Sequence, residues 1–136
     1  MRLRPVLLGT LAYLLVTFPL AIVWHMVLFR PFYDSVGYLG TSPKVELGFL
    51  AILIQGIVLS MGFGFCRFQG AGLVRGLKYA LLMGVFFWTG HVLAFAAKNS
   101  GSDTPWFYVF ETVYLALQFG VYGILIGRLS GSGNGD

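Results

Sequence analysis

Residues 88–118 read WTGHVLAFAAKNSGSDTPWFYVFETVYLALQ, and this stretch decides the fold. An apolar segment that carries His91 leads into a short polar turn, and a second apolar segment carries Glu111 and Gln118. Two apolar segments joined by a short turn predict a helical hairpin. An ionisable group costs about 2.5–3.5 kcal/mol at the centre of a membrane-spanning helix. His91 and Glu111 are therefore the first candidates for a functional site.

The composition of the whole chain predicts that this hairpin lies in a membrane. The 136 residues are 57% hydrophobic and 10% charged, whereas soluble domains carry about 25% charged residues. This small number of charges cannot cover a water-facing surface. We therefore expect the lipid bilayer to be the solvent for most of the chain. The single cysteine, Cys66, excludes an intramolecular disulfide and a cysteine-cluster metal site. The lysines and arginines are not clustered, so we expect no nucleic-acid partner.

Four apolar segments are long enough to cross a hydrocarbon core of about 30 Å at about 1.5 Å per residue. They span about residues 6–29, 45–65, 77–97 and 106–126. We expect an all-α fold, a four-transmembrane-helix up-down bundle in a single domain over residues 1–129. Residues 130–136 have no large apolar side chain and are expected to be a flexible tail.

The turns between the spans carry their own signals. Ser42-Pro43 and Thr104-Pro105 resemble an N-cap followed by proline at the first helical position. Residues 30–42 hold Phe32, Tyr33 and Tyr38 among turn-forming residues. Because such aromatic side chains favour the membrane–water interface, we expect this loop to lie on the membrane surface.

The positive charges predict the orientation of the bundle. With four spans, one side of the membrane receives most of the lysines and arginines, and the other side receives a mixture of both signs. The positive-inside rule therefore predicts that both termini are cytoplasmic. The residues on the predicted cytoplasmic side are Arg2, Arg4, Arg67, Arg75, Lys78 and Arg128.

The two halves of the chain resemble each other. His25-x-x-Leu-Phe and His91-x-x-Ala-Phe are each followed by a loop, a proline, a glutamate and a glutamine. Such halves would form two parallel helical-hairpin repeats related by an axis along the membrane normal. Chance similarity between apolar segments is the alternative, and the motif alone does not decide between them.

Counting along the helices places His25, His91 and Glu111 at one depth, roughly 8–10 Å below the outer surface. Spans one and three are diagonal in such a bundle, so the two histidines can face each other with Glu111 beside them. Imidazole and carboxylate groups are ligands for transition metals, so these three residues form a candidate metal site. Two diagonal histidines at one depth are also typical of the axial ligands of haem b, with His25 and His91 as the cofactor-binding residues.

Simpler interpretations of the same residues remain open. His91 and Glu111 can hydrogen-bond each other as structural groups, and Glu111 can pair with Lys98. Gln55, Tyr114 and Gln118 are expected to be intramembrane polar groups that bond between helices. A path along Gln55, Gln118 and Tyr122 would suit a transporter of small solutes or protons, although polar residues are sparse in its cytoplasmic half.

Several short motifs resemble a set of small bacterial four-helix integral membrane proteins with no assigned activity. They are WHMVLFRPFY at residues 24–33, LIQG at 53–56, AAK at 96–98, and the pattern E-T-V-Y-x-x-x-Q at 111–118. The resemblance covers nearly the whole chain and implies four spans in a bacterial membrane, which places the protein in the inner membrane. The residues that carry it are Trp24, His25, Phe29, Tyr33, Gln55, Gly56, Lys98, Glu111, Thr112, Tyr114 and Gln118.

Our leading functional hypothesis is a non-enzymatic accessory subunit or binding module of a membrane complex. Small residues spaced by four allow close helix contact, and the chain has more of them than one small bundle needs. One such ridge is therefore expected to bind a second copy or another membrane protein. The ridges are Gly56/Ser60/Gly64, Ala116/Gly120 and Gly123/Gly127. A haem- or metal-binding protein is the first alternative, and a transporter is the second.

Overall fold

The structure, a computed structural model, describes residues 3–98 and 105–131, and all regular elements in these ranges are helical. The elements are α1 (Leu3–Ala21), η1 (Ile22–Leu28), α2 (Arg30–Ser35), α3 (Val45–Phe65), α4 (Gly72–Trp88), η2 (Thr89–Leu93), α5 (Ala94–Lys98) and α6 (Pro105–Gly131). The η elements are π-helical turns that continue α1 and α4. Four helices are thus long and apolar enough to cross a membrane: Leu3–Leu28, Val45–Phe65, Gly72–Lys98 and Pro105–Gly131. The predicted all-α fold with four spans is confirmed.

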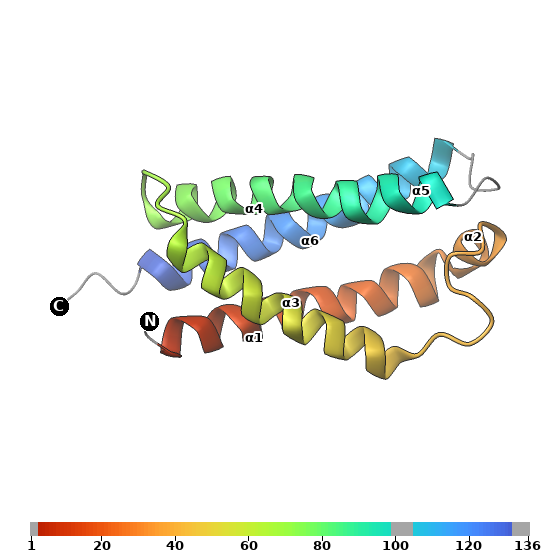
Figure 1. The fold of residues 1–136 in the computed structure, drawn as a ribbon, viewed down its shortest axis with the longest axis horizontal. Helices are drawn as coiled ribbons and strands as arrows, with labels where there is room; N and C mark the ends of the chain where they lie inside the picture. The colour runs from red at the N-terminus through yellow and green to blue at the C-terminus, as the bar shows by residue number, and fades with distance from the viewer. Residues whose placement is uncertain (1–2, 99–104, 132–136) are drawn as a thin grey trace.

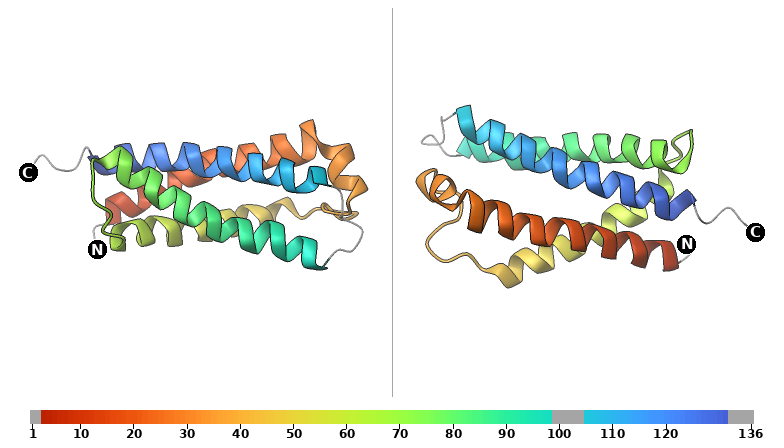
Figure 2. Two further views of the ribbon diagram at one scale, coloured as in Figure 1. Left: turned by 90° about the horizontal axis from the view of Figure 1, so that it is seen from above. Right: turned by 180° about the vertical axis from the view of Figure 1, so that it is seen from behind.

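The four long helices form a bundle with unequal contacts (Figures 1 and 2). α4 packs along α6, and α1 packs against both α3 and α6. α3 lies close to α4 near the short connection between them and diverges from it toward the opposite end (Figure 1). α1 begins and α6 ends at one end of the bundle, and α2 and α5 lie at the other.

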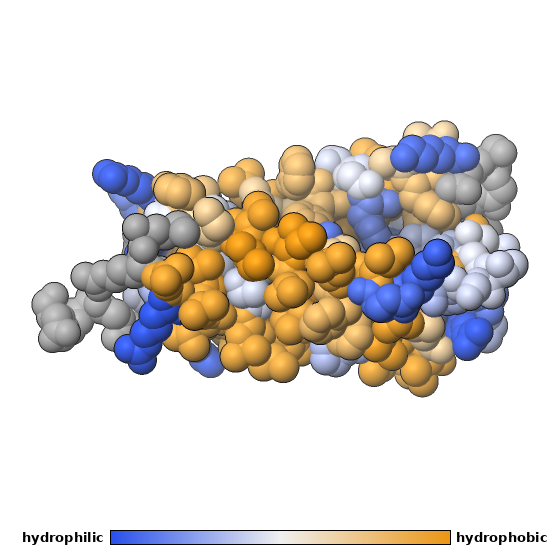
Figure 3. Space-filling model, turned by 60° about the horizontal axis from the view of Figure 1, so that its bottom comes forward, coloured by the Kyte–Doolittle hydropathy of each residue, from blue (hydrophilic) through white to orange (hydrophobic). Residues whose placement is uncertain are grey.

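The outer surface of the bundle is apolar. Figure 3 shows an apolar band across the middle of one face, with hydrophilic residues gathered toward the two ends. Large side chains such as Leu81 and Phe86 are 71% and 67% exposed on α4. In water such a surface would be an aggregation hazard, whereas lipid is its ordinary environment. The chain is therefore an integral membrane protein.

Small residues allow two helix pairs to touch backbone to backbone. A Cβ atom on Gly72 would lie 2.5 Å from the carbonyl oxygen of Gly127, and one on Gly76 would collide with the carbonyl oxygen of Gly123. A Cβ on Gly56 would lie 3.3 Å from the Thr10 carbonyl oxygen of α1. The Gly123/Gly127 ridge and the Gly56 part of the α3 ridge are therefore used inside the bundle.

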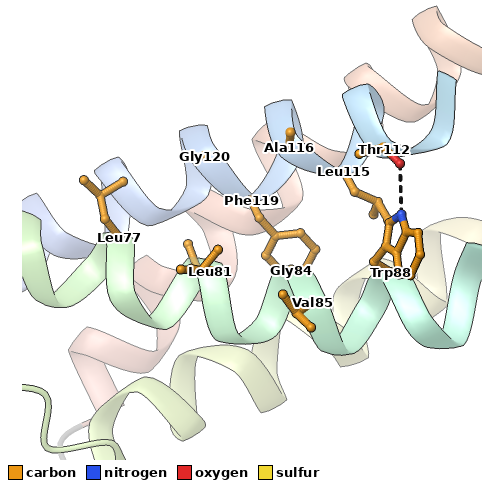
Figure 4. A pocket seen from close by; sticks show the side chains of 11 residues that line it. Leu77, Leu81, Gly84, Val85, Trp88, Thr112, Leu115, Ala116, Phe119 and Gly120 are labelled. Atoms are coloured by element: carbon orange, nitrogen blue, oxygen red, sulfur yellow. Dashed lines mark hydrogen bonds between the residues drawn. The ribbon is translucent and has the colours of Figure 1, made fainter. Parts of the chain in front are cut away.

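None of the described helices covers the Ala116/Gly120 pair. Together with Gly84 of α4 it forms the floor of an apolar groove of about 440 Å³ between α4 and α6 (Figure 4). Trp88 closes one end of this groove, where its Nε1 donates a hydrogen bond to Thr112 Oγ1 at 2.9 Å. This groove is a candidate docking surface for another helix.

Two sequence-based helix starts differ from the structure. α3 begins at Val45 with Lys44 as its N-cap, so Ser42-Pro43 precedes the helix and does not begin it. α4 begins at Gly72 and not near residue 77, because the glycine-rich segment continues the helix against α6. Pro105 does begin α6, whereas Thr104 and the predicted tail after residue 131 lie outside the described residues.

The loop after the first span turns one aromatic side chain into the bundle. Residues 30–35 form the short helix α2, which starts with Pro31 in its first turn. Tyr33 of this helix is 0% exposed, so its side chain points into the bundle and not along the membrane surface. An aromatic ring with a hydroxyl group also suits a buried position that offers a polar partner, and Glu111 is the partner of Tyr33. The position of the rest of this loop on the membrane surface stays a prediction.

Candidate functional site

Each of the two histidines lies in a π-helical turn. His25 lies in η1, where the N–H of Phe29 donates to the carbonyl of Trp24, five residues earlier, at 3.1 Å. His91 lies in η2, within the third span. π-turns are rare and frequently occur at functional sites. The occurrence of both turns at corresponding histidines supports the predicted hairpin repeat.

Three helices bring His25, His91 and Glu111 together. His25 Nε2 lies 3.0 Å from Glu111 Oε1, and His91 Nε2 lies 2.5 Å from Glu111 Oε2. One potential ligand atom from each residue falls within 4.8 Å of the others. Glu111 is 0% exposed and His25 is 6% exposed. We call these three residues the His–Glu–His cluster.

Two tyrosines complete the surroundings of the cluster. Tyr33 donates its hydroxyl hydrogen to Glu111 Oε1 and accepts one from Trp24 Nε1 at 2.9 Å. The Tyr38 hydroxyl lies 2.7 Å from His91 Nε2. Burial, together with the nearby Glu111 carboxylate, raises the pKa of Tyr33 and that of Tyr38 above the ordinary value near 10, so both remain neutral phenols. Sequence reasoning missed both tyrosines as site residues, although the aromatic residues between spans one and two were the available signal.

The hydrogen bonds of His25 define its protonation. Its Nδ1 lies 3.0 Å from the carbonyl oxygen of Ala21, which can only accept, so Nδ1 carries a hydrogen. Its Nε2 faces Oε1 of Glu111, which already accepts from Tyr33. Two acceptor atoms cannot face each other at hydrogen-bonding distance, so a proton or a metal cation must lie between them. His25 and Glu111 are therefore joined through a shared proton or cation at this contact.

A cavity of about 340 Å³ borders the cluster inside the bundle. Its outer end is lined by His25, His91 and Tyr38, and its inner end by Thr17, Gln55 and Gln118. The wall between them is mainly apolar and includes Phe18, Ile52 and Phe87. The cluster is therefore accessible from a space large enough for a small molecule.

The predicted interhelical glutamines form a second polar group at the inner end of this cavity. Gln118 Nε2 donates to the Tyr13 hydroxyl at 2.8 Å, and that hydroxyl donates to Gln55 Oε1 at 3.1 Å. Thr17 is 3% exposed, and its Oγ1 has no hydrogen-bond partner among the described residues. It lies near the Tyr13 hydroxyl without meeting hydrogen-bond geometry.

The remaining predicted polar residues have different surroundings. Lys98 is exposed at the end of α5, and Glu111 contacts His25, His91 and Tyr33 in place of Lys98. Tyr114 is buried with its ring 4.6 Å from that of His25, so it packs against the cluster. The Tyr122 hydroxyl is buried without a hydrogen-bond partner in the described part of the chain.

The arrangement does not fit haem b. Axial ligation requires the two imidazoles to face each other across a porphyrin plane. Here the carboxylate of Glu111 lies between His25 and His91 and contacts both. The space that the macrocycle needs is thus occupied by a buried side chain of the protein itself.

No protein-family model matches the chain, and comparison with curated proteins and with solved structures found no match. The functional argument therefore rests on the geometry of the cluster and its cavity.

Proposed function

We propose that this protein is a non-enzymatic membrane binding module that holds a divalent transition-metal ion at His25, His91 and Glu111. The observation that carries the proposal is the convergence of the three ligand atoms, within 4.8 Å of one another, on three separate spans. A transition-metal site needs several ligand atoms close to one point, and these three residues supply them.

The groups around the cluster support this proposal. Metal-binding histidines almost always donate their second ring N–H to a carbonyl or carboxylate, as His25 Nδ1 does to Ala21. Ligating carboxylates are in turn hydrogen-bonded, as Glu111 is by Tyr33. Two imidazoles and one carboxylate are the ligand set of many zinc sites and of non-haem iron(II) sites.

The distances require a small adjustment for an ion. Zinc–ligand bonds of about 2.0–2.1 Å in tetrahedral geometry place neighbouring ligand atoms about 3.3 Å apart. His91 Nε2 and Glu111 Oε2 lie 2.5 Å apart as a hydrogen-bonded pair. Rotation of the half-buried His91 side chain would open this pair by less than 1 Å and would bring the three ligand atoms, which lie within 4.8 Å of one another, toward tetrahedral spacing.

We further propose that the protein lies in a bacterial inner membrane with both termini in the cytoplasm. The side that carries the start of α1, the α3–α4 connection and the end of α6 holds Arg4, Arg67, Arg75, Lys78 and Arg128. This excess of positive charge supports a cytoplasmic location by the positive-inside rule. The cluster then lies in the outer half of the membrane.

The experiment is metal analysis of purified protein in lipid nanodiscs, by equilibrium dialysis against Zn²⁺ and elemental analysis. The expected result is one ion per chain, lost in Glu111→Gln and His91→Ala. Glu46→Gln is the matched control, because Glu46 lies exposed in the first turn of α3. Tyr33→Phe keeps all three ligands and should weaken affinity about tenfold or more. Equal zinc content in Glu111→Gln and Glu46→Gln would refute the metal site.

A docking role in a larger membrane complex is a second candidate function. The groove over Ala116, Gly120 and Gly84 supports it, since small residues on two adjacent helices leave room for a third helix to approach closely. Ala116→Phe fills this groove and should abolish any oligomer seen in nanodiscs, whereas Leu82→Phe, on the exposed surface of α4 outside the groove, should not. An assembly unaffected by Ala116→Phe would refute this docking surface.

A further inference from the structure

The charge of the proposed metal centre is not balanced by its three ligands. A divalent cation with the Glu111 carboxylate and the neutral imidazoles of His25 and His91 keeps one uncompensated positive charge. Glu111 lies fully buried within a membrane span, where water does not screen that charge. A monoanion as the fourth ligand would neutralise the site.

The cavity provides the position for such a ligand. Both His25 and His91 line it, and three protein ligands leave a coordination position open. The cavity extends to Pro43, Lys44 and Val45 at the start of α3, the part of this helix that diverges from α4 (Figure 1). The exposed Lys44 at this mouth attracts anions from the membrane surface.

The inner end of the cavity indicates a second polar group on the ligand. Thr17 Oγ1 is buried without a partner among the described residues, and Gln55 and Gln118 lie at the same end. A buried hydroxyl without a hydrogen bond is costly, so a ligand atom or a water molecule is expected to satisfy it. Glu111 and Gln118 are seven residues apart on α6, so the two polar ends are separated by about 10 Å.

We propose that the cavity binds a small monocarboxylate whose far end carries a hydroxyl or carbonyl oxygen. Its carboxylate coordinates the ion held by His25, His91 and Glu111, and its far oxygen hydrogen-bonds Thr17 Oγ1. Its carbon chain lies along the apolar wall formed by Phe18, Ile52 and Phe87. This inference rests on the metal-binding function proposed above, and its test separates the two.

The test uses Co²⁺-loaded protein in nanodiscs, because the visible absorption of Co²⁺ changes with its ligands. The sample is titrated with hexanoate and, separately, with 6-hydroxyhexanoate. Both should change the spectrum in a saturable way, with 6-hydroxyhexanoate binding about 5–10-fold more tightly through one added hydrogen bond. Thr17→Val keeps the side-chain shape without the hydroxyl and should remove this difference while hexanoate binding stays unchanged.

A cavity-filling variant gives an independent readout. A Cβ on Gly48 would meet no heavy atom within 4 Å in the described part of the chain, and Gly48 lines the cavity. Gly48→Leu should therefore keep Co²⁺ binding and abolish the response to both carboxylates. Gly64→Leu is the matched control, since Gly64 is equally unobstructed on α3 but lies outside this cavity.

The outcomes distinguish the two proposals. If Co²⁺ binds but neither carboxylate changes its spectrum, the ligand proposal is overturned and the metal site stands. If hexanoate and 6-hydroxyhexanoate bind with equal affinity and Thr17→Val changes neither, the proposed hydrogen bond to Thr17 at the inner end of the cavity is overturned. A protein that binds no Co²⁺ overturns the proposed function and this inference together.

Discussion

The Glu111→Gln variant should lose much more stability than the change of one atom suggests. Glu111 is 0% exposed and accepts hydrogen bonds on both oxygens from Tyr33 and the two histidines. In the variant, the amide oxygen can still accept from Tyr33, but it faces the unprotonated Nε2 of neutral His25. Either two acceptors then meet, or His25 keeps a second proton as an unpaired charge, or the amide turns so that its nitrogen donates to His25 and Tyr33 loses its acceptor.

The magnitude follows from the loss of a buried ionic partner. Removing one member of a buried, hydrogen-bonded charge pair costs about 3–5 kcal/mol. We expect about 3 kcal/mol, the lower end, because the glutamine keeps part of the hydrogen bonding and the volume of the side chain. Replacing all three members with apolar residues of similar size, as in His25→Phe/His91→Leu/Glu111→Leu, should restore most of the loss because no unpaired polar group remains.

The assay is reversible unfolding in mixed micelles by titration with sodium dodecyl sulfate, followed by loss of helical circular dichroism. Glu46→Gln, an exposed change of the same kind, should alter the free energy of unfolding by less than about 0.5 kcal/mol. The reasoning is refuted if Glu111→Gln and Glu46→Gln have equal stability. A triple variant much less stable than Glu111→Gln would show that the cluster is retained for stability and not for binding.

Two further predictions test the helix contacts and the tyrosines. Gly76→Ala should lower the free energy of unfolding by about 1–3 kcal/mol, because its Cβ would collide with the Gly123 carbonyl and separate α4 from α6. Gly90→Ala is the control, because no described heavy atom lies within 4 Å of its added Cβ, and it should leave stability unchanged or raise it. Equal losses in both variants would contradict the close contact between α4 and α6 at Gly76. The raised pKa of Tyr33 predicts that the protein loses stability in alkali. Below pH 10 the Tyr33 phenol is protonated in both the folded and the unfolded protein. Above pH 10 it ionises in the unfolded protein but not in the folded one. The free energy of unfolding should therefore fall as pH rises above about 10, and in Tyr33→Phe this fall should be smaller by about 1.4 kcal/mol per pH unit. Unfolding measured between pH 8 and 11 tests this. An unchanged slope in the variant would contradict the burial of this phenol.

The sequence by itself determined the class of fold. Four long apolar segments with few charges can satisfy their backbone hydrogen bonds in lipid only as helices, so a four-span bundle follows from composition and length. The depth of His25, His91 and Glu111 also followed from counting residues along straight helices. The sequence could not decide between a metal site and a haem site, because that choice depends on what lies between the two imidazoles.

Tertiary structure alone decided how the site is built. The π-turns at His25 and His91, the inward fold of Tyr33, and the cavity that ends at Thr17 all depend on how helices distant in sequence pack together. The large apolar residues of a membrane helix show no period that marks its inner face, because lipid-facing and core-facing ones are equally apolar. Only polar residues, such as Glu111, Tyr114 and Gln118 of α6, mark the buried face. The physical reason is that side-chain contacts between spans are set by helix rotation and crossing, which hydropathy along one chain does not record.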